Sequence, residues 1–239
     1  MQHQPRTTQR THPGGLALVV FCAVIFSIIA STAAPAAAGE EGLEATFNPE
    51  GIASLRAGEL DLLADGAITV TGAFFQKPDG TTYAADLDEG ERADAVPGAV
   101  AWQYPWGSVT TTCVAAADRL NVTVDIETGR DADMLVALYL RLAALRFPET
   151  PKFTNRSFFF YGRTTMAHNI GAPGLVAATG GDRQLVCCIE DVARPLCFGF
   201  GEPTDADKKV YPLLAWTGRH PMLTEKWPFI DRPVPPGGR

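Results

Sequence analysis

The sequence predicts an all-β protein, and specifically a two-layer antiparallel β-sandwich. Its 23 glycines and 18 prolines divide the chain into short segments. One of these, Leu120–Glu127 (LNVTVDIE), alternates apolar and polar residues with period two, and another, Ala67–Gln76 (AITVTGAFFQ), is rich in β-branched and aromatic residues. Short segments of this kind, bounded by turn residues, are typical of sandwiches.

The first 38 residues are predicted to be a signal peptide. Arg6 and Arg10 precede an apolar stretch, Leu16–Ala30, and small residues follow it up to Ala38. A basic, then apolar, then small-residue order is that of an export signal, so we expect cleavage after Ala38. The alternative is an uncleaved membrane anchor, because Leu16–Ala38 is long enough to cross a bilayer.

Residues 39–239 are expected to form a single domain outside the cytoplasm, whether periplasmic, on the cell surface or secreted. Loss of the first 38 residues removes two arginines and no acid, which changes the net charge from −7 to −9. Such an acidic chain disfavours nucleic acid as a partner. Membrane contact is expected only through the signal segment, if it is not cleaved. Acidic groups are expected on the solvated surface, as for Asp86, Asp88, Glu89 and Glu91.

Turn chemistry predicts how several strands pair. Ala67–Gln76 is followed by Lys77–Gly80 (KPDG), a turn with proline and Asp-Gly chemistry, so a hairpin is expected there. Val109–Ala115 is expected to pair with Leu120–Glu127 through a turn at Ala117–Arg119. Further short strands are predicted at Ser157–Tyr161, Gln184–Glu190, Leu196–Gly199 and Val210–Trp216.

The segment Asp133–Phe147 (DMLVALYLRLAALRF) fits two structures. Met, Leu, Ala and Arg are good helix formers, which favours a helix. The segment can also be read as an alternating strand covered on both faces. We adopt the strand, mainly because of the following resemblance.

Three stretches together resemble the β-supersandwich domain, of galactose-mutarotase-like fold, found at the N-terminus of secreted bacterial glycoside hydrolases. They are Trp102–Thr112 (WQYPWGSVTTT), Asp118–Phe147 with the proline after it, and Trp227–Gly238 (WPFIDRPVPPGG). The resemblance covers about residues 43–238. It implies an exported non-catalytic domain that binds a glycan or supports a glycoside hydrolase module. In that family the PPGG turn leads into one more strand, so we expect a sandwich that lacks its last strand.

No motif in the sequence identifies a reaction. The G-x-S-x-G, H-E-x-x-H, Walker and dinucleotide patterns are absent from the sequence, so enzymatic activity is uncertain and less expected than a binding role. No catalytic residue, cofactor or metal ligand is assigned. One alternative is a sugar-active enzyme, an epimerase or hydrolase, in which His168 works with Glu190 or Asp191 as acid and base. Another is a structural envelope protein that binds partner proteins.

Candidate ligand-binding residues are mostly aromatic: Trp102, Tyr104, Trp106, His168 and Trp216. The first three lie within five positions, and on one strand their side chains would share a face. Pro105 and Gly107 are expected to break that strand. The alternative is that these aromatic side chains belong to the core.

Four cysteines follow the signal peptide, and export permits disulfides. On a strand, the adjacent Cys187 and Cys188 would point to opposite faces. One interpretation is a disulfide from Cys188, or else Cys187, to Cys197 across a hairpin. The other is that the cysteines are small buried side chains.

Overall fold

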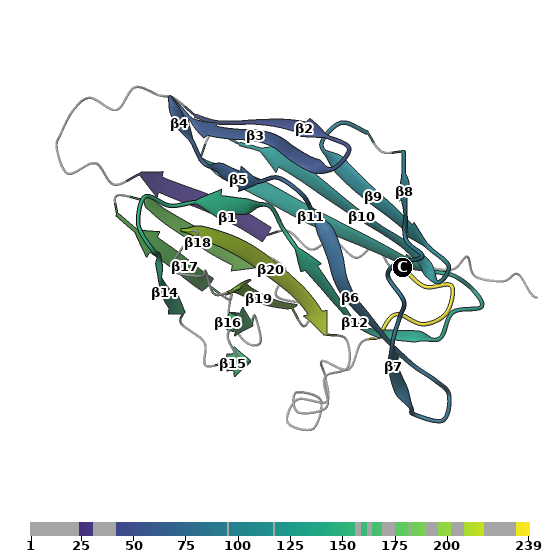
Figure 1. Ribbon diagram of the computed structural model, residues 1–239. Coiled ribbons are helices and arrows are strands. Elements are labelled where there is room, and N and C mark those ends of the chain that lie inside the picture. Colours follow the sequence, from purple (N-terminus) through teal and green to yellow (C-terminus); the bar gives the residue numbers. More distant parts are fainter. Residues whose placement is uncertain are drawn as a thin grey trace, which may run out of the picture.

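The computed structural model describes residues 24–30, 42–94, 96–116, 118–155, 159–161, 164–168, 175–181, 183–189, 196–201, 208–217 and 233–239. These residues form strands and loops and contain no helix, which confirms the predicted all-β class. Within these ranges there is accordingly no helix long and apolar enough to span a membrane. Two large antiparallel sheets form a sandwich, with a small third sheet beside them (Figure 1).

The first large sheet, called here the β10 sheet, has eight strands in the order β14-β17-β18-β1-β11-β10-β9-β8. Each strand is antiparallel to its neighbours. The strands are β1 (Val24–Ala30), β8 (Glu91–Ala93), β9 (Ala99–Tyr104), β10 (Gly107–Ala115), β11 (Arg119–Thr128), β14 (Lys152–Asn155), β17 (Leu175–Gly180) and β18 (Arg183–Ile189).

The second large sheet, called the β12 sheet, has nine strands. Seven follow the order β15-β16-β19-β20-β12-β6-β7, while β13 pairs with both β20 and β5. The strands are β5 (Leu63–Asp65), β6 (Thr69–Gln76), β7 (Thr82–Ala84), β12 (Met134–Arg141), β13 (Ala144–Arg146), β15 (Phe159–Tyr161), β16 (Thr164–His168), β19 (Leu196–Gly201) and β20 (Lys209–Thr217). The small sheet contains β2 (Leu43–Asn48), β3 (Gly51–Ala57) and β4 (Leu60–Asp61).

The alternation in β11 has the predicted structural meaning. Leu120, Val122, Val124 and Ile126 are each 3% exposed or less and belong to the core. β11 pairs with β10 along its whole length, from Gly107 opposite Thr128 to Ala115 opposite Leu120, which confirms the predicted pair. Because residues directly opposite one another share a face, β10 adds its own buried side chains to the same layer.

β12 confirms the strand interpretation of the ambiguous segment. Leu135, Val136, Ala137 and Leu138 are consecutive and all buried, so the strand is covered on both faces. β6 and β20 pair with its two edges, and Val234 of the C-terminal tail pairs with Leu135. The strand ends at Arg141, and the chain resumes pairing in β13. Its helix-forming composition is therefore overridden by sheet pairing and burial.

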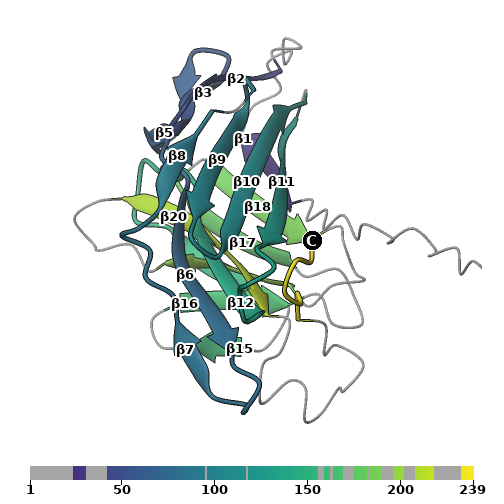
Figure 2. The ribbon, with the colours of Figure 1, turned by 90° about the vertical axis from the view of Figure 1, so that its right-hand side faces the viewer.

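The β6–β7 hairpin also forms as predicted, with Phe75 opposite Tyr83 and the KPDG turn between the strands. It extends beyond the rest of the β12 sheet (Figures 1 and 2). Asp79 stabilises the turn, because its carboxylate accepts a hydrogen bond from the Thr81 N–H at 2.8 Å. That hydrogen bond lowers the pKa of Asp79.

One strand comes from the segment that was predicted to be a leader. β1 lies inside the β10 sheet, between β11 and β18 (Figure 1).

Strands β2 to β5 were not predicted either. They carry short alternations and an Asn48 turn, in which the Asn48 side chain accepts hydrogen bonds from the Glu50 and Gly51 N–H groups.

Candidate functional site

The β9–β10 hairpin builds the most distinctive surface of the described chain. Tyr104 pairs with Gly107 across a turn made by Pro105 and Trp106, so the predicted strand does break here. Gly107 has φ +151°, and a Cβ there would lie 2.0 Å from the Glu127 carbonyl oxygen. Only glycine fits this position without strain, and it lets the hairpin approach β11 closely.

The turn brings three rings into one continuous stack. The centroids of Trp102 and Tyr104 are 6.2 Å apart with an interplanar angle of 21°. Those of Tyr104 and Trp106 are 4.8 Å apart at 6°. The predicted shared face thus exists, although the strand itself ends at Tyr104. We call these three residues the aromatic stack.

The far end of the stack is closed by other residues. The Arg92 guanidinium lies 4.4 Å from the centre of the Trp102 ring, a cation–π contact, and donates a hydrogen bond to the Pro49 carbonyl oxygen. Tyr104 is 4% exposed, and burial raises its pKa to about 12. These contacts favour the core interpretation for Tyr104 and leave Trp106 as the end of the stack that a ligand can approach.

Trp106 lines an open hollow of about 350 Å³, called here the Trp106 hollow. Three aromatic rings of the hollow contact one another. The centroid of the Phe75 ring lies 5.3 Å from that of Trp106 in an edge contact and 5.9 Å from that of Tyr83 in a stacked contact. Phe75 is 1% exposed and forms the floor, whereas Tyr83 is 38% exposed. The described residues that line it are Phe75, Tyr83, Ala85, Asp86, Glu89, Pro105, Trp106, Gly129, Arg130, Asp131, Ala132 and Asp133.

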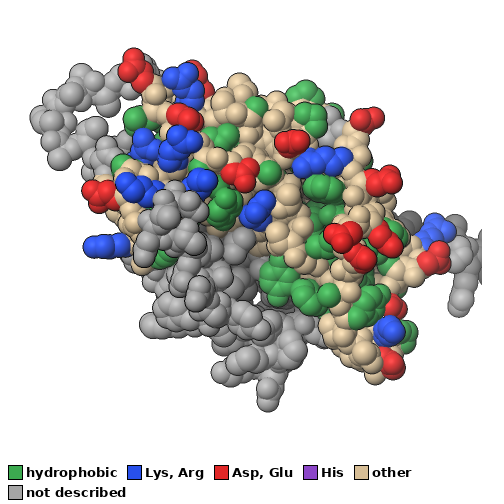
Figure 3. Space-filling model, in the orientation of Figure 1, with side chains coloured by type: hydrophobic (Ala, Val, Ile, Leu, Met, Phe, Trp, Pro, Cys, Tyr) green, Lys and Arg blue, Asp and Glu red, His purple; other side chains and the backbone are tan. Residues whose placement is uncertain are grey.

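Carboxylates surround these rings. In the part of the chain that the structure describes, Asp86, Glu89, Asp131 and Asp133 line the hollow together with one cation, Arg130. The Tyr83 hydroxyl donates a hydrogen bond to Asp133 Oδ2 at 3.0 Å, which fixes the ring against the loop after β11. Burial, and then this hydrogen bond, raise the pKa of Tyr83. On the face shown in Figure 3, acidic side chains lie beside hydrophobic ones at the end of the molecule where Figure 1 shows β7.

The loop between β11 and β12 is held by both the hairpin and the C-terminal tail. The Gly129 N–H donates to the Trp106 carbonyl at 2.8 Å, and the Gly237 N–H donates to the Gly129 carbonyl at 2.8 Å. Thr128 is 7% exposed, and its hydroxyl donates to the Pro235 carbonyl at 2.7 Å and accepts from the Gly238 N–H at 3.1 Å. These contacts give the hollow a fixed wall.

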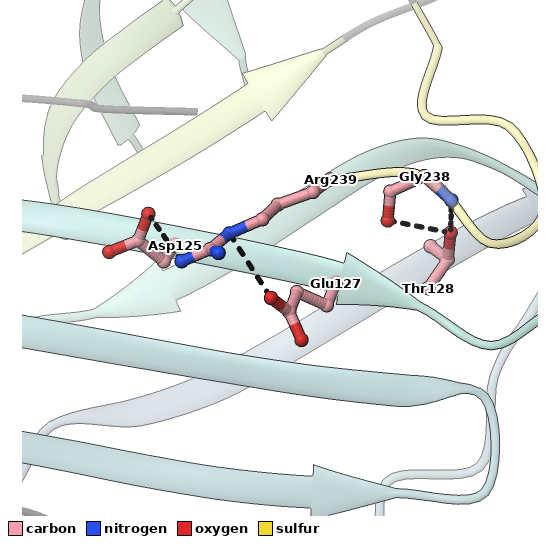
Figure 4. A network of polar contacts seen from close by, with 5 residues as sticks. All are labelled: Asp125, Glu127, Thr128, Gly238 and Arg239. Atoms are coloured by element: carbon pink, nitrogen blue, oxygen red, sulfur yellow. Dashed lines mark hydrogen bonds and ion pairs between the residues drawn. The ribbon is translucent and has the colours of Figure 1, made fainter. Parts of the chain in front are cut away.

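Arg239 adds charge pairing to this attachment of the tail (Figure 4). Its Nε lies 3.1 Å from a Glu127 carboxylate oxygen, and its Nη2 lies 3.8 Å from Asp125. Glu127 and Arg239 are both substantially exposed, so the pairs contribute little beyond orientation. The resemblance placed residues 227–238 at the exit of the domain, and the described part of that stretch packs back onto β11 and β12, with Val234 paired to Leu135.

The other sequence-predicted candidates do not reach the hollow. Trp216 pairs with Leu138 and is 3% exposed, which favours the core interpretation. The backbone of His168 lies at the end of β16, four strands from β6 in the β12 sheet and so about 19 Å away at ordinary strand spacing. Glu190 and Asp191, its predicted carboxylate partners, lie outside the described residues. Catalysis by this set stays a prediction.

The strand pairing also bears on the predicted disulfide. Cys187 is fully buried while Cys188 is partly exposed, as expected for neighbours on a strand. The two strands concerned are not hairpin partners: β18 pairs with β17 and β1, and β19, which carries Cys197, pairs with β16 and β20. The Cys188–Cys197 disulfide stays a prediction, since the Cys197 side chain lies outside the described ones.

Trp106 is the one lining residue that was among the predicted site residues. Of the others, Tyr83, Asp131 and Asp133 carry the polar chemistry beside it, and local signals existed for them: Tyr83 follows the KPDG turn and the two aspartates follow the clearest strand. Asp86 and Glu89 were expected to be solvated, and both are exposed. Within the described ranges no three His, Cys, Asp or Glu side chains are grouped closely enough to hold a metal ion.

The fold and this surface define an all-β sandwich with an aromatic and acidic hollow at one end. Comparison with known protein families, with curated protein sequences and with solved structures found no match to this chain.

Proposed function

We propose that this protein is an exported, non-catalytic glycan-binding β-sandwich domain and that the Trp106 hollow is its binding site. The observation that carries the proposal is that an exposed ring, Tyr83, a half-buried ring, Trp106, and four carboxylates line one open hollow. A sugar has apolar faces that suit aromatic rings and hydroxyl groups that suit carboxylate acceptors. Concave sites with rings and a few polar groups are the usual form of ligand pockets.

The charges of the hollow narrow the class of glycan. Four carboxylates and one guanidinium give a negative field, so a neutral glycan or one with amino groups is favoured over a polyuronate. The Tyr83 ring already has one cation beside it, because Lys77 Nζ lies 5.6 Å from the centre of this ring. A protonated amino sugar can make the same cation–π contact.

The supersandwich resemblance supports the same proposal from the sequence. It associates the fold with secreted glycoside hydrolases, in which the N-terminal sandwich does not carry the catalytic groups. A glycoside hydrolase module is accordingly the partner we propose for this domain, working outside the cytoplasm. The sandwich architecture and the aromatic stack are compatible with that association, while the specific family remains part of the proposal.

Isothermal titration against a panel of polysaccharides tests the function. The panel contains a neutral β-glucan, xylan, mannan, chitosan and polygalacturonate, and we expect heats for a neutral glycan or chitosan and none for polygalacturonate. Flat heats for the whole panel would remove the glycan-binding function.

Two tryptophan variants locate the site. Trp106→Ala is expected to abolish the heats, because it removes the ring that lines the hollow. The matched control is Trp102→Ala, which removes a half-buried tryptophan from the same stack on the side closed by Arg92. Circular dichroism and melting temperature establish that both variants are folded. Equal loss of binding in the two variants at unchanged fold would place the site elsewhere.

A further inference from the structure

The β10 sheet contains a slot that is one strand wide, and β1 fills it. β1 is antiparallel to β18 through seven residue pairs, from Val24 opposite Ile189 to Ala30 opposite Arg183. On its other side it is antiparallel to β11 through four pairs, from Val24 opposite Val122 to Ser27 opposite Arg119. Figure 1 shows the N-terminal strand β1 within this sheet.

The slot borders the core of the sandwich. Phe26 occupies the position opposite Leu120 on one side and Cys187 on the other, and both of these side chains are buried. Val24 lies opposite Val122 and Ile28 lies opposite Leu185, which are each 1% exposed. Removal of β1 would therefore expose apolar side chains as well as two unpaired backbone edges.

The two edges of the slot are poorly matched to each other. Because β1 is antiparallel to both, β11 and β18 run in the same direction. Direct closure would require a parallel ladder in a sheet whose described ladders are all antiparallel. It would also move β18, β17 and β14 by about 4.8 Å relative to the β12 sheet, out of register with their core contacts.

The strand that fills the slot belongs to the predicted signal peptide. Cleavage after Ala38 would leave β11 and β18 with free edges, which are templates for an added strand. We propose that the slot between β11 and β18 is a strand-acceptor site, filled by Val24–Ala30 in the uncleaved chain and by an extended, uncharged apolar segment of a partner protein after cleavage. A processed second copy has lost this segment, so the donor is a different protein.

The composition of the donor follows from the occupant. Val24–Ala30 (VIFSIIA) contains no charge, proline or glycine over seven residues. A donor of the same kind keeps both hydrogen-bonding edges of its backbone available and places apolar residues opposite Leu120, Val122, Leu185 and Cys187. A proline within the segment would remove a donor N–H and disrupt the ladder.

The test uses the full chain, with a specific protease site placed between Ser31 and Ala38. The folded protein is cut, and a peptide of residues 23–31 with a lysine tail is added as the probe. The peptide is added to the cut protein from which the leader has been removed. We expect it to bind once per chain, to raise the melting temperature of that protein, and to protect Cys187 from iodoacetamide. Labelling at Cys187 is assigned by fragment mass spectrometry.

The matched control is the same peptide with Ser27→Pro. Ser27 pairs with Arg119 and Val186, so the proline removes a backbone N–H from the ladder. We expect this peptide to bind about tenfold more weakly than the unchanged peptide and to protect Cys187 less. Three results would overturn the proposal: a cut protein that loses its leader with no change in melting temperature or Cys187 protection, equal binding of the two peptides, or aggregation that neither peptide prevents.

Discussion

The ring of Tyr104 lies parallel to that of Trp106 at 4.8 Å, and through this contact the core of the sandwich supports its surface hollow. Tyr104 is buried, whereas Trp106 is half-buried and lines the hollow. The buried Tyr104 ring therefore holds the Trp106 ring in position at the wall of the hollow. Residues that hold the Tyr104 ring in place are expected to influence the stability of the sandwich.

Gly90 is the first such residue. A Cβ at this position would lie 2.3 Å from Tyr104 Cε1, so Gly90→Ala must displace the ring. We expect a loss of about 1–3 kcal/mol in the free energy of unfolding, measured by urea denaturation. The control is Gly129→Ala, where the added carbon meets the Trp106 carbonyl oxygen at an ordinary 3.6 Å. Similar losses in the two variants would show that Tyr104 does not occupy this position.

Thr128 connects the C-terminal tail to the hollow. Thr128→Val keeps the side-chain shape but leaves the Gly238 N–H and the Pro235 carbonyl without their hydroxyl partner. These two groups also bond to each other at 2.9 Å and neither residue is buried, so we expect the free energy of unfolding to fall by about 0.5–1.5 kcal/mol. Thr110→Val, on the outer face of β10, serves as the control because no buried tail contact depends on it. Unchanged stability of Thr128→Val in calorimetry would mean that the tail is held by other contacts.

Buried thiols give stability an alkaline limit. Burial raises the pKa of Cys113 to about 12 from an ordinary value of 9.0. Above pH 9 the unfolded chain loses this proton while the folded chain keeps it, so the unfolded state binds fewer protons and the free energy of unfolding falls as pH rises. Below pH 9 the contribution is fully present. The pKa of Cys187 is raised in the same direction.

Urea denaturation at several values between pH 8 and pH 10.5 measures this dependence. One buried thiol adds at most about 1.4 kcal/mol per pH unit to the slope. Cys113→Ala is expected to lower stability at every pH and to make its fall above pH 9 shallower. An identical slope in the variant and the parent chain would contradict the burial of this thiol.

Coverage of β12 on both faces predicts sensitivity at adjacent positions. Val136 is 5% exposed, and Val136→Thr places a hydroxyl in apolar surroundings at a cost of about 1–3 kcal/mol. Val114→Thr is the same exchange at a residue that is 55% exposed, and its effect is expected to stay within about 0.5 kcal/mol. Thermal denaturation of the two variants side by side decides the matter; tolerance at Val136 would argue that this face of β12 is open.

Much of the sandwich could be predicted because strands have a local signature. In β11 the period-two alternation alone specified which side chains are buried, and the KPDG turn alone specified the β6–β7 hairpin. For β12 the composition favoured a helix, and only the pairing with β6 and β20 decides for the strand. Periodicity reports which face of a segment is apolar, but not which distant segment covers it.

The sequence by itself determined the all-β class, the pairing of β10 with β11, and the close grouping of Trp102, Tyr104 and Trp106. The tertiary structure alone decided that Trp106, Tyr83 and the loop carboxylate of Asp133 line one hollow, because Tyr83 and Asp133 are separated by 50 residues. It also decided the place of β1, because an apolar composition of this kind fits both a signal peptide and a buried strand. The physical reason is the same in both cases: burial and backbone pairing are satisfied between remote segments, and local sequence specifies only the groups that must be satisfied.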